Sequence, residues 1–281
     1  MRSLDVSRIS EEVARLSQEA NYHLTEEMEE ALAEAVEREE SEAGRDVLHQ
    51  LQKNASIASD EEIPMCQDTG STVVFVELGQ EVELQGGHLE EAINEGVRKG
   101  YEEGYLRKSI VADPAESRKN TGDNTPAIVH TEIVPGDEIR LTVAPKGGGS
   151  ENMSRLEMLT PADGVEGVRE FVVDTVVEAG PNPCPPVVVG VGIGGNFEKS
   201  ALLAKKALME PISPGERQSD MPELEEEILE EINNSGVGPQ GFGGRVTALG
   251  VNIKTYPCHI ASLPVAVNIN CHATRHKSVT I

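Results

Sequence analysis

The sequence has few cysteines, comparatively few basic residues and no long apolar run. Its four cysteines, at positions 66, 184, 258 and 271, are too few and too scattered for the disulfide framework of a secreted domain, and no CxxC pair indicates a zinc knuckle. No apolar run approaches the roughly 20 residues that a membrane-spanning helix needs. The N-terminal stretch lacks the apolar core of a secretory signal, so we expect a cytoplasmic protein.

Acidic residues outnumber basic ones by two to one. Forty-nine Asp and Glu against 24 Lys and Arg give a formal net charge of −25 in 281 residues. Such a charge argues against nucleic acid or an anionic membrane as a partner. Glutamate runs at 26–44 and 223–234 are typical of solvent-facing helix surfaces, and an acidic coat of this kind would suit a salt-rich cytoplasm.

The hydrophobic pattern predicts an α/β or α+β fold in which helices surround mixed sheets. We expect one domain over 1–281, with a helical N-terminal segment (1–55) followed by an α/β body (56–281). The body has a strand at 71–79, a short buried strand that runs into a glycine loop over 185–195, a helix over 88–107 that carries Arg107 near its end, and a helix over 164–180 closed by Gly180. It also has a hairpin over 127–149 around the turn signal "PGD", a helix after 195, an acidic helix near 223–234, and two final strands.

One glycine pattern imitates a dinucleotide fingerprint. Gly190, Gly192 and Gly195 match GxGxxG between an apolar strand and a helix, and Glu210 lies about 20 residues further on. The acidic residue of that fingerprint should follow a second strand, whereas Glu210 follows a helical pattern. Close backbone packing, or an anion site at the helix N-terminus, therefore explains these glycines better than nucleotide binding.

Three cysteines stand in stiff, polar loops, where a thiol that only fills a core is not expected. Cys66 lies in "PMCQDTG", Cys184 in "GPNPCPPV" and Cys271 in "NINCHATRH". Three thiolates brought together by the fold would suit zinc or an iron–sulfur cluster, and inert buried thiols are the alternative.

Five longer phrases carry a resemblance to a known family. "PMCQDTG", "KNTGDNTPAIVHTEIVPGD", "APKGGGSENMSRLEMLTPADG", "GPNPCPPVVVGVGIGGNFEKSALLAKKAL" and "CHIASLPVAVNINCHATRH" resemble the iron–sulfur hydro-lyases, namely class I fumarases and the related L-tartrate dehydratases. The resemblance runs from about residue 20 to the C-terminus. In single-chain members a second domain follows this region, so the chain resembles a separate α subunit.

The resemblance implies a set of site residues. It assigns Cys66, Cys184 and Cys271 as the ligands of a [4Fe-4S] cluster, and it leaves Cys258 as a thiol that is not a ligand. His259 and Asp68 match catalytic positions, and His259, Gln67, Arg107 and Gly148 match positions that contact substrate. "YLRKS" also offers Lys108 in place of Arg107. His272 and His276 have no counterpart role, so we expect polar supporting or subunit contacts from them.

The implied chemistry explains these residue types. An iron with an open position stabilises a hydroxyl that enters or leaves, while cations and donors such as Arg107 and His259 orient a small dicarboxylate. The resemblance implies that the general base comes from a β subunit, and we expect a hetero-oligomer, α2β2. We therefore expect the α chain alone to be inactive.

Other functions stay open at this point. The chain could be an electron-transfer protein, although such clusters usually have a fourth thiolate, or a regulatory subunit without metal. Between the two hydro-lyase activities we favour fumarate hydratase over L-tartrate dehydratase, because no residue of this chain decides and fumarate hydration is the commoner role.

Overall fold

The computed structural model describes residues 1–213 and 219–281. It has helices and mixed sheets, which confirms the α/β class and the helical N-terminal segment. The helices are α1 (Val6–Tyr22), α2 (Glu26–Arg38), α3 (Glu42–Glu61), α4 (Leu89–Glu103), α5 (Gly148–Glu151), α6 (Gly164–Ala179), α7 (Phe197–Ala207), α8 (Pro222–Asn233) and the short 3₁₀ helix η1 (Pro239–Gly241). The strands are β1 (Arg2–Asp5), β2 (Ser71–Gly79), β3 (Val82–Gln85), β4 (Ile128–Val134), β5 (Ile139–Lys146), β6 (Arg155–Leu159), β7 (Val187–Gly194), β8 (Ala248–Tyr256), β9 (Leu263–Asn270) and β10 (Lys277–Thr280).

The chain forms two compact units, each assembled from separated stretches. The first unit comprises residues 1–24, 54–148 and 275–281, and the second comprises residues 25–53 and 149–274. The predicted helical segment is therefore shared: α1 belongs to the first unit, α2 belongs to the second, and α3 contributes to both.

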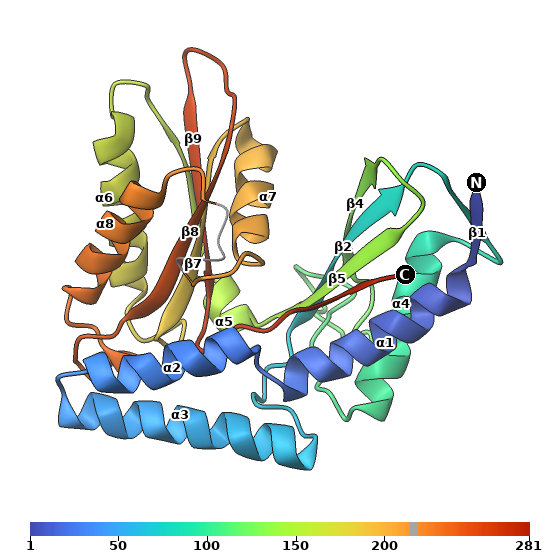
Figure 1. Cartoon of the computed structure of the whole chain (residues 1–281), viewed down its shortest axis with the longest axis horizontal. Helices are drawn as coiled ribbons and strands as arrows, with labels where there is room; N and C mark the ends of the chain where they lie inside the picture. Colours follow the sequence, from blue (N-terminus) through green and yellow to red (C-terminus); the bar gives the residue numbers. More distant parts are fainter. Residues whose placement is uncertain (214–218) are drawn as a thin grey trace. The chain divides into compact units, whose positions relative to one another are not determined.

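The first unit is a four-stranded sheet of order β10-β5-β2-β4 with α1 and α4 packed together on one face (Figure 1). Alternate residues of β2 and β5, including Val74, Val76, Leu141 and Val143, form the core with these helices. The hairpin predicted over 127–149 is wrong. β2 lies between β4 and β5, parallel to the former and antiparallel to the latter, so the turn that joins them passes around the end of β2.

The prediction of a helix over 88–107 is too long. α4 ends at Glu103, and Gly104 takes the C-cap position. Arg107 therefore stands in the extended segment that follows the helix. The glycines at 96 and 100 allow α4 to pack closely on α1, because a Cβ at either would approach the backbone of α1 to within 2.7 Å.

The second unit has three layers. Its sheet, of order β6-β9-β7-β8, is covered by α6 and α8 on one face and by α7 on the other (Figure 1). β7 is an uninterrupted apolar strand because both of its faces are buried. α6 ends, as predicted, at Gly180, whose φ of 54° lies in the left-handed region that glycine tolerates.

The glycines of the GxGxxG pattern serve packing. A Cβ at Gly190 would collide with the carbonyl oxygen of Ala204, and one at Gly192 would collide with that of Ser200, both in α7. The side-chain amide of Asn196 caps this helix by accepting from Lys199 N at 3.1 Å. The packing interpretation of these glycines is thereby confirmed.

A buried carboxylate ties the α2–α3 turn to the segment before β8. Glu39 is 1% exposed, and its oxygens accept from Arg245 N at 2.9 Å, Val246 N at 2.8 Å and Ser41 N at 2.8 Å. Burial alone would raise the pKa of Glu39, but these backbone N–H donors outweigh it and hold that pKa below its ordinary value. In the described ranges, no helix is both long and apolar enough to cross a bilayer.

Candidate functional sites

The Cys66 loop of the first unit is organised around Asp68. The Asp68 backbone N–H donates to Cys66 Sγ at 3.4 Å, while the Asp68 carboxylate accepts from Gly70 N at 3.1 Å and from Gly148 N at 2.7 Å. Asp68 and Gly148, two predicted site residues 80 positions apart, are thus in contact. Asp68 is half-buried, so its carboxylate is both anchored and reachable.

Buried donors hold the backbone carbonyls of the same loop. The Tyr101 hydroxyl donates to Thr69 O at 2.7 Å, and the Asn124 amide donates to Gly70 O at 3.1 Å. Burial raises the pKa of Tyr101 to about 12, so its hydroxyl keeps the proton that it donates. The loop is therefore fixed before any ligand binds.

Arg275 is the strongest of these anchors, and sequence reasoning missed it. It is 4% exposed, and its guanidinium donates to Asp68 O and, at 3.0 Å, to Asn21 Oδ1. A buried arginine without such acceptors would be costly, so the two contacts explain its place. The sequence indicates this residue only as an arginine in the phrase "CHATRH", in which His272 and His276 were expected to make polar contacts and Arg275 had no predicted role.

The remaining predicted residues of the first unit are exposed. Gln67 and Arg107 both have exposed side chains, and the Arg107 carbonyl accepts from Thr69 Oγ1 at 2.8 Å. That bond fixes the Arg107 backbone beside the Cys66 loop. Lys108 is half-buried, and its carbonyl accepts from Asn120 Nδ2 at 2.9 Å.

Cys184 and Cys271 lie at the same end of the sheet in the second unit. Cys184 comes shortly before β7, and Cys271 directly follows β9, which is antiparallel to β7. The His272 N–H donates to Cys184 O at 3.3 Å and thereby joins the two cysteine segments. Both cysteines are half-buried.

His259 lies at the opposite end of this sheet. It stands in the β8–β9 connection with Cys258, and both residues are exposed. β7 and β9 have eight residues each. At a rise of ~3.3 Å per residue, the length of these strands places His259 roughly 25 Å from Cys184 and Cys271. Within one chain, the structure therefore does not bring this histidine to the two cysteines.

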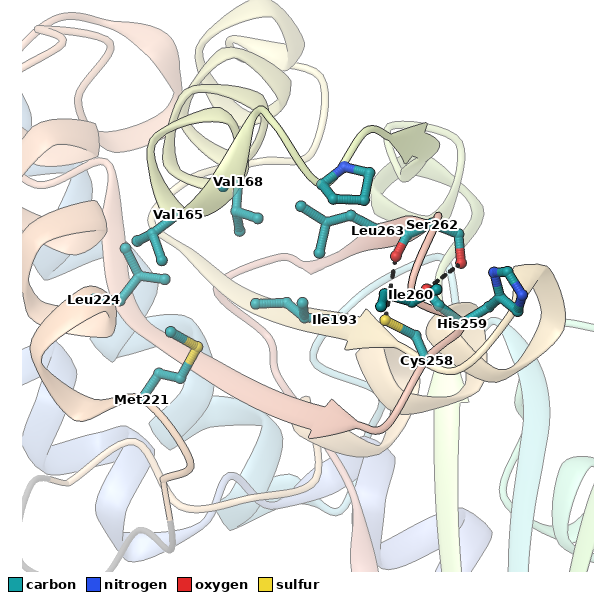
Figure 2. A pocket seen from close by; sticks show the side chains of 12 residues that line it. Val165, Val168, Ile193, Met221, Leu224, Cys258, His259, Ile260, Ser262 and Leu263 are labelled. Atoms are coloured by element: carbon teal, nitrogen blue, oxygen red, sulfur yellow. Dashed lines mark hydrogen bonds between the residues drawn. The ribbon is translucent and has the colours of Figure 1, made fainter.

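Two cavities flank the connection that carries His259. One, of about 330 Å³, is lined by apolar side chains such as Val165, Ile193 and Leu224, with Cys258 and His259 at its edge (Figure 2). Its apolar walls suit a carboxylate poorly. The other, of about 470 Å³, has Asn196, Lys199 and His259 among its lining residues and is the more polar of the two.

Comparisons with known proteins give a consistent result. A family model described as "Fumarate hydratase (Fumerase)" matches residues 10–280. A protein of Methanocaldococcus jannaschii named "Putative L(+)-tartrate dehydratase subunit alpha" is 42% identical over 272 residues, which are 95% of this chain and 95% of that protein. The "L(+)-tartrate dehydratase subunit alpha" of Escherichia coli K12 is 31% identical over 278 residues, 98% of this chain and 91% of its own length.

This chain belongs to the class I fumarate hydratase and tartrate dehydratase α-subunit family. The resemblance found in the sequence is confirmed, and with it the assignment of the chain as a hydro-lyase subunit of this family.

The donors present fit the iron–sulfur cluster that the family implies. None of the four cysteines, all of which the structure describes, forms a disulfide, and the Cys66 sulfur accepts a backbone N–H, as the sulfurs of bound clusters do. Cys184 and Cys271 share one end of a sheet, whereas Cys258 donates to Ser262 O at 3.2 Å at the other. Among the residues that the structure describes, no three His, Cys, Asp or Glu side chains form a site for a single metal ion.

Proposed function

We propose that this chain is the α subunit of a [4Fe-4S] hydro-lyase that interconverts fumarate and L-malate. The family match supports the reaction class, and the anchored Cys66–Asp68 loop is the observation that carries the site. Cys66, Cys184 and Cys271 are the proposed ligands. When bound, a cluster held by three thiolates would offer one open iron as a Lewis acid toward the hydroxyl of the substrate.

The residues of this chain would bind and orient the dicarboxylate. Arg107 and Gln67 are exposed beside the Cys66 loop, so a guanidinium and an amide are available to a substrate carboxylate. The Gly148 N–H is already taken by Asp68, so that contact positions the Asp68 carboxylate. Asp68 is the carboxylate of this chain that would accept a hydrogen bond from the substrate hydroxyl.

We propose a β subunit as the partner that supplies the general base. The names of the relatives, which designate α subunits, support this partner. We also propose a dimer of αβ pairs. Its support is the separation of His259 from Cys184 and Cys271 within one chain: a His259 that contacts substrate would serve a site whose cluster is held by a second copy.

L(+)-tartrate is the second candidate substrate, because both relatives described above are named after it. L-Malate and L(+)-tartrate differ in the second hydroxyl of tartrate, and no described contact of this chain distinguishes the two compounds. Cysteines that form no disulfide in the described residues agree with a reducing cytoplasm as the proposed location.

The experiment is an anaerobic assay of the α chain co-purified with its β subunit. Fumarate, L-malate and L(+)-tartrate are supplied separately, and kcat/KM is measured for each. A higher value for fumarate and L-malate supports the proposal, and a strong preference for L(+)-tartrate replaces it. Activity of the isolated α chain with a full cluster, equal to that of the pair, would contradict the two-subunit proposal.

A further inference from the structure

The side chain of Gln240 connects the segments of two proposed cluster ligands. Its backbone N–H and its amide Nε2 each donate to Pro185 O at 2.7 Å, and Nε2 lies 3.2 Å from His272 Nδ1. Pro185 follows Cys184, and His272 follows Cys271. One amide with two hydrogens therefore reaches both segments at once.

The Cys184 backbone needs this support. Cys184 has φ of 59°, a left-handed conformation that is unfavourable for a residue with a Cβ. Such a conformation persists where surrounding contacts over-determine it. The Cys184 N–H donates to Pro181 O at 3.0 Å, and the Cys184 carbonyl accepts from the His272 backbone N–H at 3.3 Å. The direction of the Cys184 side chain is set by this backbone.

The segment that carries Gln240 is itself held by packing and hydrogen bonds. Its φ of 51° lies in the left-handed region, within η1 and among glycines of positive φ. A Cβ at Gly241 would lie 2.5 Å from Pro181, so this loop packs directly on the Cys184 loop. Gly238 N donates to Thr247 Oγ1 at 3.0 Å, and Glu39 fixes the residues before Thr247. The Gln240 amide is therefore attached to a rigidly held segment.

We propose that Gln240 is a positioning residue for the iron–sulfur cluster. Its amide holds the carbonyl after Cys184 and the ring after Cys271 in one fixed arrangement, so two of the three thiolates are spaced before iron arrives. This proposal rests on the proposed function for the identity of the bound group, and it gives Gln240 no contact with substrate.

The first measurement compares cluster retention in the anaerobic αβ complex. Gln240→Ala removes the amide, Gln240→Glu keeps the length but removes both amide hydrogens, and Gln50→Ala changes an exposed glutamine as the matched control. Iron release to a chelator should be about tenfold faster in both Gln240 variants and unchanged in the control. Release at the wild-type rate in both Gln240 variants would overturn the proposal.

The second measurement needs no cluster. In the apo complex, iodoacetamide alkylation of each cysteine is followed by mass spectrometry. Gln240→Ala should accelerate modification of Cys184 several-fold and leave Cys66 unchanged, whereas equal acceleration at both cysteines would mean general loosening and would contradict a positioning role. If the wild-type complex takes up no cluster, the proposed function fails, and the contrast between Cys184 and Cys66 still decides whether Gln240 holds this loop.

Discussion

The two ends of the sheet in the second unit differ in how their loops are held. At the Cys184 end, hydrogen bonds from Gln240 and His272 fix two successive carbonyls, and the surrounding loops pack on one another. At the His259 end, the hydrogen bonds from Ala261 N to His259 Nδ1 and from Ser262 Oγ to His259 O are local to the β8–β9 connection, and Ile260 is 92% exposed. One end is thus rigidly held, and the other presents side chains outward. A thiol occurs at both ends, so chemistry alone does not distinguish them.

The largest expected effect comes from the same substitution at the two ends. Cys184→Ala should abolish cluster assembly, as should Cys271→Ala and Cys66→Ala, because three thiolates are needed to hold the group. Cys258→Ala should retain it. Iron and sulfide analysis with an anaerobic visible spectrum measures the outcome, and a cluster lost only in the Cys258 variant would reverse the assignment.

The exposed end should affect catalysis without affecting the cluster. His259→Ala should lower kcat by about 10²-fold or more, the usual loss for a group that transfers protons or stabilises charge, with full iron content. Loss of iron in this variant would instead indicate a structural role.

Mixing two inactive variants tests which copy uses His259. Co-assembly of Cys184→Ala and His259→Ala α chains with β subunits should restore about a quarter of wild-type activity if sites are shared between two α copies, since half of the random pairs hold one complete site. No recovery, with hybrid assembly verified by mass, would mean that each site uses the histidine of its own chain.

Glu39 fixes the segment before Thr247, behind the Cys184 end of the sheet, so we expect its substitution to lower the free energy of unfolding. Glu39→Gln should lower the free energy of unfolding by about 2 kcal/mol at pH 7, because charged acceptors for backbone N–H groups are lost. The folded-state pKa of Glu39 is depressed, so its contribution is present above the ordinary value of 4.5 and is lost as pH falls through the folded-state pKa.

Denaturant unfolding at several pH values from 7 down to about 2.5, well below the ordinary pKa of 4.5, provides the measurement. The difference between wild type and Glu39→Gln should shrink toward the acidic limit. Glu37→Gln, at an exposed position in the last turn of α2 just before Glu39, should change stability by less than about 0.5 kcal/mol throughout. A pH-independent difference would assign the effect of Glu39→Gln to packing.

The smallest effect is expected at the tip of the exposed end. Ile260→Ser should alter the free energy of unfolding of the α chain by less than about 0.5 kcal/mol, because this side chain is 92% exposed. Urea titration of the α chain alone measures this change in the free energy of unfolding. A loss above 1 kcal/mol would show that this end is packed as tightly as the other.

Periodic patterns predicted the local elements well. The strand at β2, the helix α6 with its terminal Gly180 and the strand–glycine–helix passage around β7 all follow from short-range spacing and steric rules. The pairing of β4 with β5 was mispredicted because turn residues indicate a reversal of the chain but not whether another strand enters between its arms.

The site was predictable where residues are adjacent in sequence and not where the fold joins distant ones. The Cys66–Asp68 loop was visible as a phrase, whereas Arg275 and Gln240 act on carbonyls 207 and 55 positions away. The separation of His259 from Cys184 follows from strand direction, which the phrases do not encode.

The interleaving of the two units has a consequence for synthesis. Glu39 is made 206 residues before Arg245, the partner of its carboxylate, and translation at ~5–20 residues per second makes that interval roughly 10–40 s. The first unit receives its last strand, β10, only when residue 280 has been added. The acidic α2–α3 hairpin is therefore made well before the segment that its buried carboxylate binds, and the first unit lacks its last segment until after residue 274, the last of the second unit, has been added.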